Sequence, residues 1–201
     1  RALLGGRLAP EQTGPEGYLV RQVLVETAVN GPASFYLGAM IEAPDAGIVI
    51  LGARGGEPDI EAKVREGRTT IERLAVGPVG AIDAAEARAF AARLAVANDH
   101  VAGFCAVLAS LADALIGLDA TLVEINPLVL GEAGGFVALD AKIVLDDNAA
   151  FRHPDRPAED PVDQPGDLEA SAQRHRINYV PMDGDIGLVA NGAGLGMATV
   201  D

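Results

Sequence analysis

Cysteine and aromatic residues are scarce in this sequence. Among 201 residues there are one cysteine, no tryptophan, three tyrosines and five phenylalanines. The lone Cys105 cannot form an internal disulfide, and no charged and apolar leader with a cleavage site opens the chain. We therefore expect a protein of a reducing compartment, the cytoplasm, in which Cys105 is a small core residue.

Positive charge is scarce as well. There are 15 Lys and Arg residues against 29 Asp and Glu, which gives a formal net charge of −14. Such a chain repels nucleic acid and anionic membranes, so we expect neither as a partner. No apolar run is expected to be long enough to span a bilayer. Because 49% of the residues are hydrophobic, the chain can bury a core, and its length fits one domain or one domain with part of another.

The stretch from Thr121 to Leu145, TLVEINPLVLGEAGGFVALDAKIVL, predicts two antiparallel strands joined by a glycine-bearing loop. We expect Leu130 to pair with Phe136, which fixes the rest of the register because side chains alternate across a strand. Four polar residues then share one face: Glu124, Asn126, Asp140 and Lys142. Apolar residues flank them on that face (Leu122, Leu128, Ala138, Val144), and the opposite face is apolar (Val123, Ile125, Leu139, Ala141, Ile143).

Two interpretations of this polar group are open. In the first, a Glu–Lys pair and an Asn–Asp pair lie on a hydrated face, each stabilising the sheet by about 0.2–1 kcal/mol. In the second, the amide oxygen of Asn126 and the carboxylate of Asp140 hold a hard cation such as Mg²⁺. Such a cation takes one or two protein carboxylates and leaves its other positions to water and phosphate.

The first third of the chain predicts a meander of three strands, over residues 18–28, 34–43 and 48–53, with turn residues between them. Glu26 is interpreted as a solvated strand end or, less simply, as a ligand. Gly55-Gly56 follows the third strand and predicts either an ordinary turn or a place where a phosphate approaches the backbone. Residues 1–17 predict a connection with one short strand, and residues 59–66 a helical turn.

Two helices are predicted after this meander. Asp83 followed by Glu86 resembles a capping box at the start of a helix over residues 83–96. A second helix over residues 98–116 is apolar on most faces and is expected in the core. Together with the strands these helices predict an α+β fold. His100, His153 and His175 have no second ligand at metal-binding spacing, so we interpret them as structural or surface residues.

The last quarter of the chain predicts a connector and a second domain. Residues 154–170 are acidic and proline-rich. A helical piece over 168–176, a short strand over 177–180 and a buried strand over 186–190 are expected next. Asn191-Gly192-Ala193-Gly194-Leu195-Gly196 then predicts a turn and a helix start. Its backbone N–H groups either hold an anion or form a tight turn without a ligand.

Several long motifs resemble one family: VEINPLVL, LDAKIVLDDNAAFRHP, NYVPMDGDIGLVANGAGLGMATVD, LVETAV and FYLGAM. They are similar to the β subunits of succinate–CoA ligase and the related malate–CoA ligase. The resemblance implies the later part of an ATP-grasp domain over residues 1–153, the connector over 154–170, and the beginning of a flavodoxin-like α/β domain over 171–201. For a eukaryotic source it implies the mitochondrial matrix.

The resemblance also implies an activity. Such a β subunit is part of an acid–thiol ligase and works with an α subunit, nucleotide, CoA and a dicarboxylic acid. Together the subunits couple formation or cleavage of succinyl-CoA or malyl-CoA to ATP or GTP through a phosphohistidine on the α subunit. A fragment of the β subunit is expected to be inactive alone, because that histidine belongs to the partner.

Six residues match functional positions of that family. Asn126 and Asp140 match its Mg²⁺ ligands, and Glu124 matches the glutamate that faces the phosphohistidine. Asn191 matches a substrate-side residue at the subunit junction. Glu26 matches a residue at the nucleotide hinge, with Val29 a backbone contact beside it.

The chain departs from the family at two places. Ser34 stands where the family has a second glutamate that contacts the nucleotide, and the loop at Gly55-Gly56 is one residue longer than in the succinate enzymes. Both departures bear on nucleotide affinity or choice. Ser34, together with the parts of the family's β subunit that the resemblance does not cover, favours an alternative in which the chain is a divergent ATP-grasp-like module kept for assembly with a partner. A third alternative is an ATP-grasp ligase that joins a carboxylate to an amine.

Overall fold

The chain consists of two compact units in a computed structural model, one formed by Val25–Asp155 and the other by Arg1–Leu24 together with Arg156–Asp201. The residues that the structure describes are 3–8, 17–42, 47–56, 66–67, 69–155, 168, 171–172, 175, 177, 179–180 and 184–200. The first unit contains the stretch 121–145. The second contains the glycine-rich segment that begins at Asn191.

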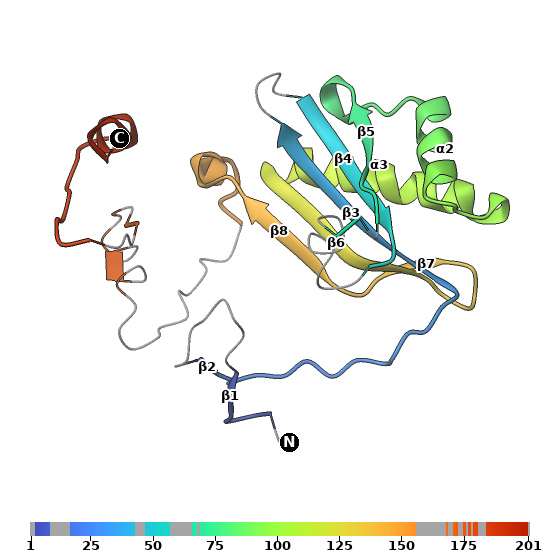
Figure 1. Ribbon diagram of the computed structural model, residues 1–201, viewed down its shortest axis with the longest axis horizontal. Helices are drawn as coiled ribbons and strands as arrows, with labels where there is room; N and C mark the ends of the chain where they lie inside the picture. The colour runs from blue at the N-terminus through green and yellow to red at the C-terminus, as the bar shows by residue number, and fades with distance from the viewer. Residues whose placement is uncertain are drawn as a thin grey trace. The chain divides into compact units, whose positions relative to one another are not determined.

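An antiparallel six-stranded sheet forms the centre of the Val25–Asp155 unit (Figure 1). Its strands are β3 (Ala33–Glu42), β4 (Gly47–Arg54), β5 (Glu72–Val76), β6 (Ala120–Leu130), β7 (Phe136–Ala138) and β8 (Ala141–Leu145). The order is β5-β4-β3-β6-β7, and β8 also pairs with β6. Strands β7 and β8 therefore follow one another along the same side of β6, opposite β3.

The sequence predicted most of this sheet. The antiparallel pair β3 and β4 matches the expected strands at 34–43 and 48–53. Strand β5 was missed, although its sequence carries the signal of a half-buried strand. Leu74 and Val76 are buried, whereas Arg73 before them and Ala75 between them are exposed. That alternation is what one buried sheet face requires.

Both predicted helices are confirmed. Helix α2 (Ala84–Arg93) begins at Asp83, whose Oδ1 accepts hydrogen bonds from the backbone N–H groups of Ala85 and Glu86 at 2.8 and 3.0 Å. These bonds satisfy two of the donors that a helix start leaves open. The short helix η3 (Asn98–His100) leads directly into α3 (Val101–Gly117).

The core lies between the sheet and these helices, and three of the five phenylalanines meet in it. Phe35 on β3, Phe104 on α3 and Phe136 on β7 have ring centroids 5.3 to 6.1 Å apart. Tilted and edge-on pairs of this kind stabilise a core beyond the area that they bury. Most of the phenylalanine in this aromatic-poor chain thus lies at one place in the core, where α3 packs against β3 and β7.

The helical stretch Asn98–Gly117 corrects one expectation. By length and composition it is long and apolar enough to cross a membrane, contrary to the prediction that no run would be. One face of this helix is nevertheless buried in the core: Phe104, Leu108, Leu111 and Leu115 are all buried, whereas Ile116 is 40% exposed. Such burial is what the core helix of a folded domain shows, and it agrees with the prediction that this helix belongs to the core.

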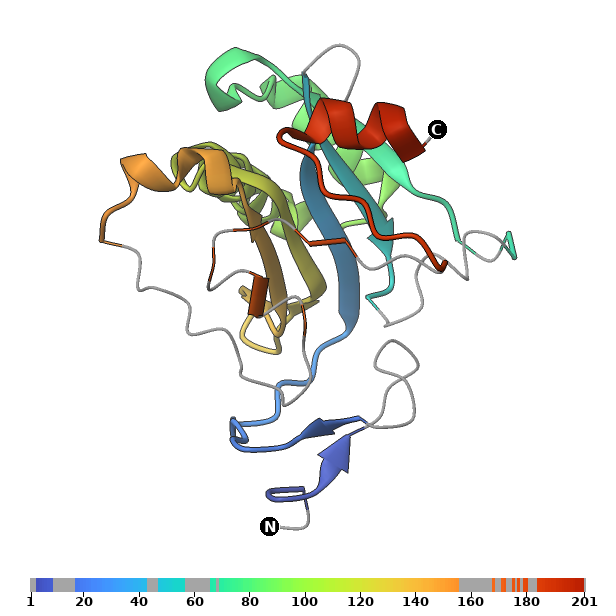
Figure 2. The same cartoon turned by 90° about the vertical axis from the view of Figure 1, so that its left-hand side faces the viewer.

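The Arg1–Leu24 part of the second unit holds a small hairpin. Strand β1 (Arg7–Leu8) pairs with β2 (Tyr18–Leu19), as the two short arrows near the N-terminus in Figure 2 show. The predicted short strand before Gly17 is therefore confirmed. The predicted strand over 18–28 is wrong beyond Val20. Val20 still exchanges backbone hydrogen bonds with Gly5 and Gly6, but residues 21–28 are irregular, and Leu24 and Val25 are 83% and 87% exposed.

The C-terminal segment forms fewer elements than predicted. Helix α5 (Ala193–Val200) follows a bend at Asn191 and Gly192, as expected. The buried strand expected at 186–190 is wrong, since these residues are irregular and Ile186 and Val189 are 94% and 99% exposed. The described residues of 177–180 form no strand either. A strand needs a partner for its backbone groups, and none of the described residues supplies one here.

Some predictions fall on residues outside the described ranges. They are all but the last residue of the helical turn expected at 59–66, of which Glu66 is described and lies in a turn, and most of the connector at 154–170. In the helical piece expected at 168–176, the described residues Leu168, Ser171 and Ala172 are helical.

Candidate functional site

The predicted register around strand β6 is confirmed. Leu130 pairs with Phe136, and Glu124 pairs with Lys142. Between these pairs the backbone N–H of Asn126 donates to the carbonyl oxygen of Asp140 at 3.2 Å. Asp140, which lies between β7 and β8, is therefore opposite Asn126 on β6, two register positions from the Glu124–Lys142 pair.

A bulge at Asn126-Pro127 interrupts the alternation of side chains along β6, so the residues after it lie on the opposite face from the one that simple alternation predicts. Against β3, Phe35 pairs with Leu128 and Leu37 pairs with Ile125, so two residues of β6 lie opposite one residue of β3. Proline has no N–H to donate to the ladder, which is why it occurs in a strand at such a bulge. The bulge corrects one prediction: Leu128 is 2% exposed and packs in the core, on the side away from Glu124.

The four polar residues of the hairpin do not form the ion pair of the first interpretation. Among the described residues, neither Glu124 nor Lys142 takes part in a salt bridge. The Asp140 Oδ1 atom accepts a hydrogen bond from the backbone N–H of Ala141 at 2.8 Å, which holds this carboxylate at the junction of β7 and β8. The Asn126 Oδ1 atom is buried.

These two side chains are chemically suited to Mg²⁺. An amide oxygen and a carboxylate oxygen are both hard donors, and the backbone bond between Asn126 and Asp140 keeps their residues opposite each other. Within the described ranges there is no group of three or more His, Cys, Asp or Glu residues that could hold a metal. A cation at Asn126 and Asp140 would therefore fill its other positions with water or phosphate. The assignment of these residues as metal ligands stays a prediction.

The structure brings a further residue, Tyr36, to this region, and the sequence did not predict it as a site residue. Gly38 on β3 pairs with Glu124 on β6. A Cβ atom at Gly38 would lie 2.9 Å from the Tyr36 hydroxyl oxygen, so the phenol lies over this glycine. Residues directly opposite each other share one face, which places the Tyr36 hydroxyl on the face that carries Glu124. A tyrosine two positions before a strand glycine is the sequence signal that could have indicated it.

The predicted nucleotide residues lie in the irregular segment before β3. Glu26 is exposed and Val29 is half-buried. Two residues after Val29, a Cβ atom at Gly31 would lie 1.8 Å from the Leu130 carbonyl oxygen, so this segment packs against the end of β6. Asn191 is exposed and belongs to the other unit. The binding roles of these three residues stay predictions.

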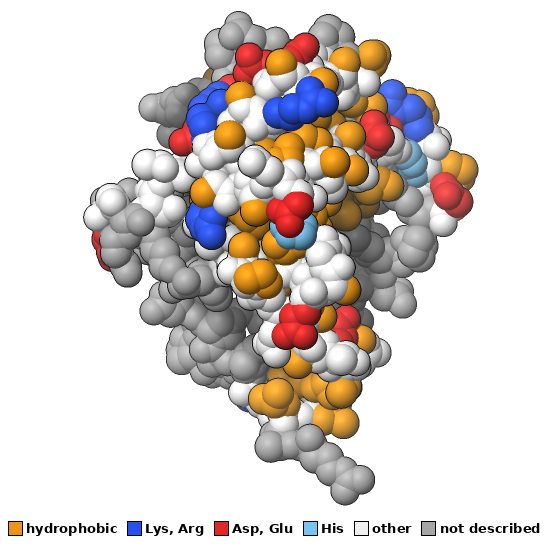
Figure 3. Space-filling view, turned by 90° about the vertical axis from the view of Figure 1, so that its right-hand side faces the viewer, with side chains coloured by type: hydrophobic (Ala, Val, Ile, Leu, Met, Phe, Trp, Pro, Cys, Tyr) orange, Lys and Arg blue, Asp and Glu red, His pale blue; other side chains and the backbone are white. Residues whose placement is uncertain are grey.

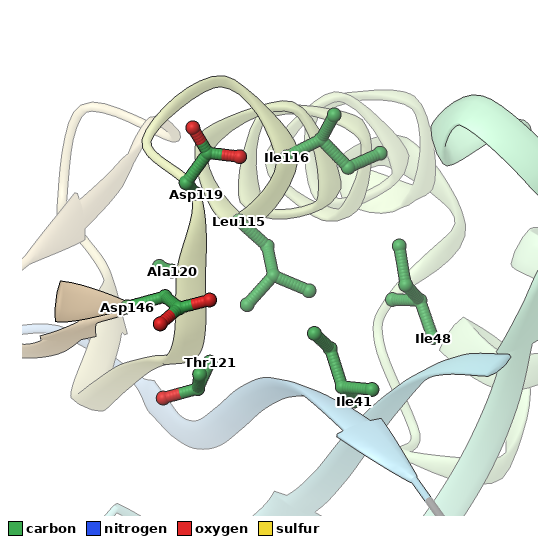
Figure 4. Close-up of a pocket in the computed structure, with 8 residues that line it drawn as sticks. All are labelled: Ile41, Ile48, Leu115, Ile116, Asp119, Ala120, Thr121 and Asp146. Carbon is green, nitrogen blue, oxygen red and sulfur yellow. The ribbon is translucent and has the colours of Figure 1, made fainter. Parts of the chain in front are cut away.

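Two hollows of the described part of the Val25–Asp155 unit contain none of the predicted site residues. One, of about 170 Å³, lies at the start of β6 and is lined by isoleucine and leucine side chains with Asp119 and Asp146 at one side (Figure 4). It is smaller than the range of about 300–1,000 Å³ typical of ligand pockets. The other, of about 620 Å³, lies between α2 and α3 and is lined mainly by the small apolar side chains of alanine, valine and cysteine. Figure 3 shows this side of the molecule, where hydrophobic side chains lie between separate basic and acidic ones.

Asp119 forms a structural cluster with the 3-10 helix η4 (Asp147–Arg152). Its carboxylate accepts a hydrogen bond from Arg152 at 2.7 Å and lies 2.8 Å from His153 Nε2. The hydrogen bond with His153 lowers the pKa of Asp119 below its ordinary value of 3.8, and the charge of Arg152 lowers it further, although burial opposes the change. These contacts agree with the structural role expected for His153.

Comparisons with known proteins give the family. Residues 1–130 match a family model described as an ATP-grasp domain. The chain is 42% identical over 200 residues to the β subunit of an ADP-forming succinate–CoA ligase from Desulfosudis oleivorans, covering 100% of this chain and 52% of that protein. It is 39% identical over 202 residues to the corresponding subunit from Acidiphilium cryptum, covering 100% of this chain and 50% of that protein. The chain thus spans about half the length of these curated relatives.

A solved structure supports the fold alone. The ATP citrate lyase of Methanothrix soehngenii, determined with citrate and coenzyme A, matches 74% of this chain and 34% of its own chain. The TM-score is 0.53 and the sequence identity 19%. Because the family model covers residues 1–130, well over half of the chain, the chain belongs to the ATP-grasp family.

Proposed function

We propose that this chain is part of the β subunit of a nucleotide-dependent acid–CoA ligase. Such an enzyme couples formation or cleavage of succinyl-CoA or malyl-CoA to ATP or GTP through a phosphohistidine on an α subunit. The main support is the strand register that sets Asn126 opposite Asp140, with Glu124 two positions away on β6. The 42% identity to a named β subunit over the whole chain supports it independently.

Each predicted residue has one role in this proposal. Asn126 and Asp140 hold Mg²⁺, which when bound offsets the negative charge of the nucleotide phosphates. Glu124 accepts a hydrogen bond from the ring of the partner histidine and orients it toward the phosphate. Glu26 and Val29 bind the nucleotide, and Asn191 lies on the side of the acid substrate. The chain alone transfers no phosphoryl group, because the histidine is on the partner.

The metal assignment is tested by paramagnetic broadening. Mn²⁺ titrated into the ¹⁵N-labelled chain in the presence of ADP should broaden the amide signals of residues 124–126 and 139–141 selectively. Asp140→Ala should abolish this local effect because it removes the only carboxylate of the pair. Asp113→Ala, which removes an exposed carboxylate from α3, is the matched control and should leave it unchanged. Broadening that is spread over the surface and insensitive to Asp140→Ala would rule the site out.

The role of Glu124 is tested in the complex. With an α-like subunit that carries phosphohistidine, we expect transfer of the phosphoryl group to ADP or GDP. Glu124→Gln should slow phosphoryl transfer by about a hundredfold or more, which is the usual effect of losing a proton-accepting side chain. The local Mn²⁺ broadening should persist in this variant. An unchanged rate would remove Glu124 from the mechanism.

A second function is favoured by Ser34. A serine at this position supplies no charge to a nucleotide, so the chain would instead be a divergent module kept for assembly with an α-like partner. This alternative predicts a stable complex with the partner and no thermal shift with Mg²⁺ and either ADP or GDP. Such a result, together with a silent Asp140→Ala variant, would replace the first proposal.

A further inference from the structure

Ser34 accepts two hydrogen bonds from the loop that follows β4. The backbone N–H of Gly55 donates to the Ser34 carbonyl oxygen at 2.8 Å, and the N–H of Gly56 donates to the Ser34 hydroxyl oxygen at 3.2 Å. Gly55 has φ of 86°, which turns the chain in a conformation that favours glycine. Two consecutive backbone groups of the loop are thus bound to one residue of β3.

Gly56 packs closely against Pro127. A Cβ atom at Gly56 would lie 2.4 Å from the Pro127 Cβ, 2.7 Å from its Cα and 2.9 Å from the Phe35 carbonyl oxygen. No side chain fits there, so only glycine allows the loop backbone to approach the bulge of β6 this closely. The loop and the bulge therefore form one packed unit.

Pro127 is held on its other side as well. Its carbonyl oxygen accepts a hydrogen bond from the Leu139 N–H at 3.0 Å, and the neighbouring Asn126 N–H donates to the Asp140 carbonyl oxygen at 3.2 Å. Pro127 is therefore confined between the Leu139-Asp140 segment, which joins β7 to β8, and the loop at Gly56. Any shift of Pro127 is passed to Asn126 through the peptide bond that joins them.

We infer that Ser34, Gly56 and Pro127 form a clamp that positions the Asn126 side chain for the divalent cation. The inference rests on the proposed function, since it concerns the same cation site. Ser34 and Gly56 are positioning residues in this arrangement, because neither is required to contact the cation. The serine hydroxyl acts by fixing the loop, and the absence of a side chain at Gly56 lets the loop support Pro127.

Mn²⁺ titrations of the labelled chain with ADP test the clamp. Ser34→Ala removes the acceptor of the Gly56 N–H and should weaken local Mn²⁺ binding about tenfold, the lower end of the range for residues that orient metal ligands. Ser34→Thr retains a hydroxyl and should restore binding. Gly56→Ala forces the loop away from Pro127 and should weaken binding at least as much. The dispersed amide spectrum of each variant shows whether it folds.

Two matched controls exclude a general effect of the substitutions. Ser110→Ala changes an exposed serine on α3, and Gly47→Ala changes a strand glycine with no atom within 4 Å of its added Cβ. Both should bind Mn²⁺ like the unchanged chain. If Ser34→Ala and Gly56→Ala also bind like the unchanged chain while Asp140→Ala does not bind, the clamp is refuted and the cation site stands. If Asp140→Ala binds like the unchanged chain, both the site and the clamp are refuted.

Discussion

Strand β6 and the segment 184–190 are both rich in apolar residues, yet their surroundings differ. Strand β6 pairs with β3 on one side and with β7 and β8 on the other, and Val123 and Leu128 are 4% and 2% exposed. In the segment 184–190, Ile186 and Val189 are 94% and 99% exposed and no strand forms. An apolar run becomes a buried strand only where neighbouring strands pair with its backbone and another layer covers its side chains.

The largest expected difference between the two regions comes from truncating a side chain in each. Phe104→Ala removes the ring that contacts both Phe35 and Phe136, and it should lower the free energy of unfolding by about 3–5 kcal/mol. Val189→Ala should change it by less than about 0.5 kcal/mol because the side chain is exposed. Urea unfolding followed by circular dichroism measures both. Equal losses would mean that Val189 is packed as firmly as the core.

Adding a methyl group sharpens the same contrast. A Cβ atom at Gly52 on β4 would lie 2.7 Å from Phe90 and 3.0 Å from Leu94, where α2 packs on the sheet. Gly52→Ala should therefore destabilise the protein by about 1–3 kcal/mol, the usual effect of overpacking. Gly187→Ala places its methyl group in open space and should be nearly neutral. The two urea midpoints give the comparison, and a tolerated Gly52→Ala would show that α2 packs loosely.

Removal of a helix cap should have a smaller effect. Asp83→Ala deprives the N–H groups of Ala85 and Glu86 of their acceptor and should lower the free energy of unfolding by about 1 kcal/mol. Asp185→Ala, a change of an exposed aspartate in the second unit, serves as the control and should have little effect. Thermal unfolding of the two variants measures the difference. Equal melting temperatures would mean that the cap adds no stability.

The smallest expected effect is a change in acid sensitivity. The folded-state pKa of Asp119 lies below its ordinary value of 3.8, so the ionised carboxylate stabilises the folded protein above that value. This contribution is lost as the pH falls through the lowered pKa. Asp119→Asn should therefore lower the free energy of unfolding at neutral pH and flatten its decline below about pH 4. Asp185→Asn is the control and should leave the dependence of the free energy of unfolding on pH as it is in the unchanged protein. Identical slopes for Asp119→Asn and the unchanged protein would contradict the pKa assignment.

The site was predictable to the extent that it depends on one hairpin. The pairing of Glu124 with Lys142, and of Asn126 with Asp140, follows from local alternation and a short glycine-bearing loop, and the structure has that register. The same alternation failed for Leu128, because the bulge at Pro127 is set by pairing with β3, a strand about 90 residues earlier in the chain. Tyr36 and the clamp at Gly56 were missed for the same reason.

By itself the sequence determined the local elements: the cap at Asp83, the apolar helix α3, and the register of the 121–145 hairpin. These depend on residues a few positions apart, whose preferences act in any context. Only the tertiary structure decided which apolar runs are buried and where the Asn126 side chain is supported. Those outcomes depend on distant segments, such as Ser34 and Gly56, because a strand or a bulge has no fixed face until its neighbours pair with it.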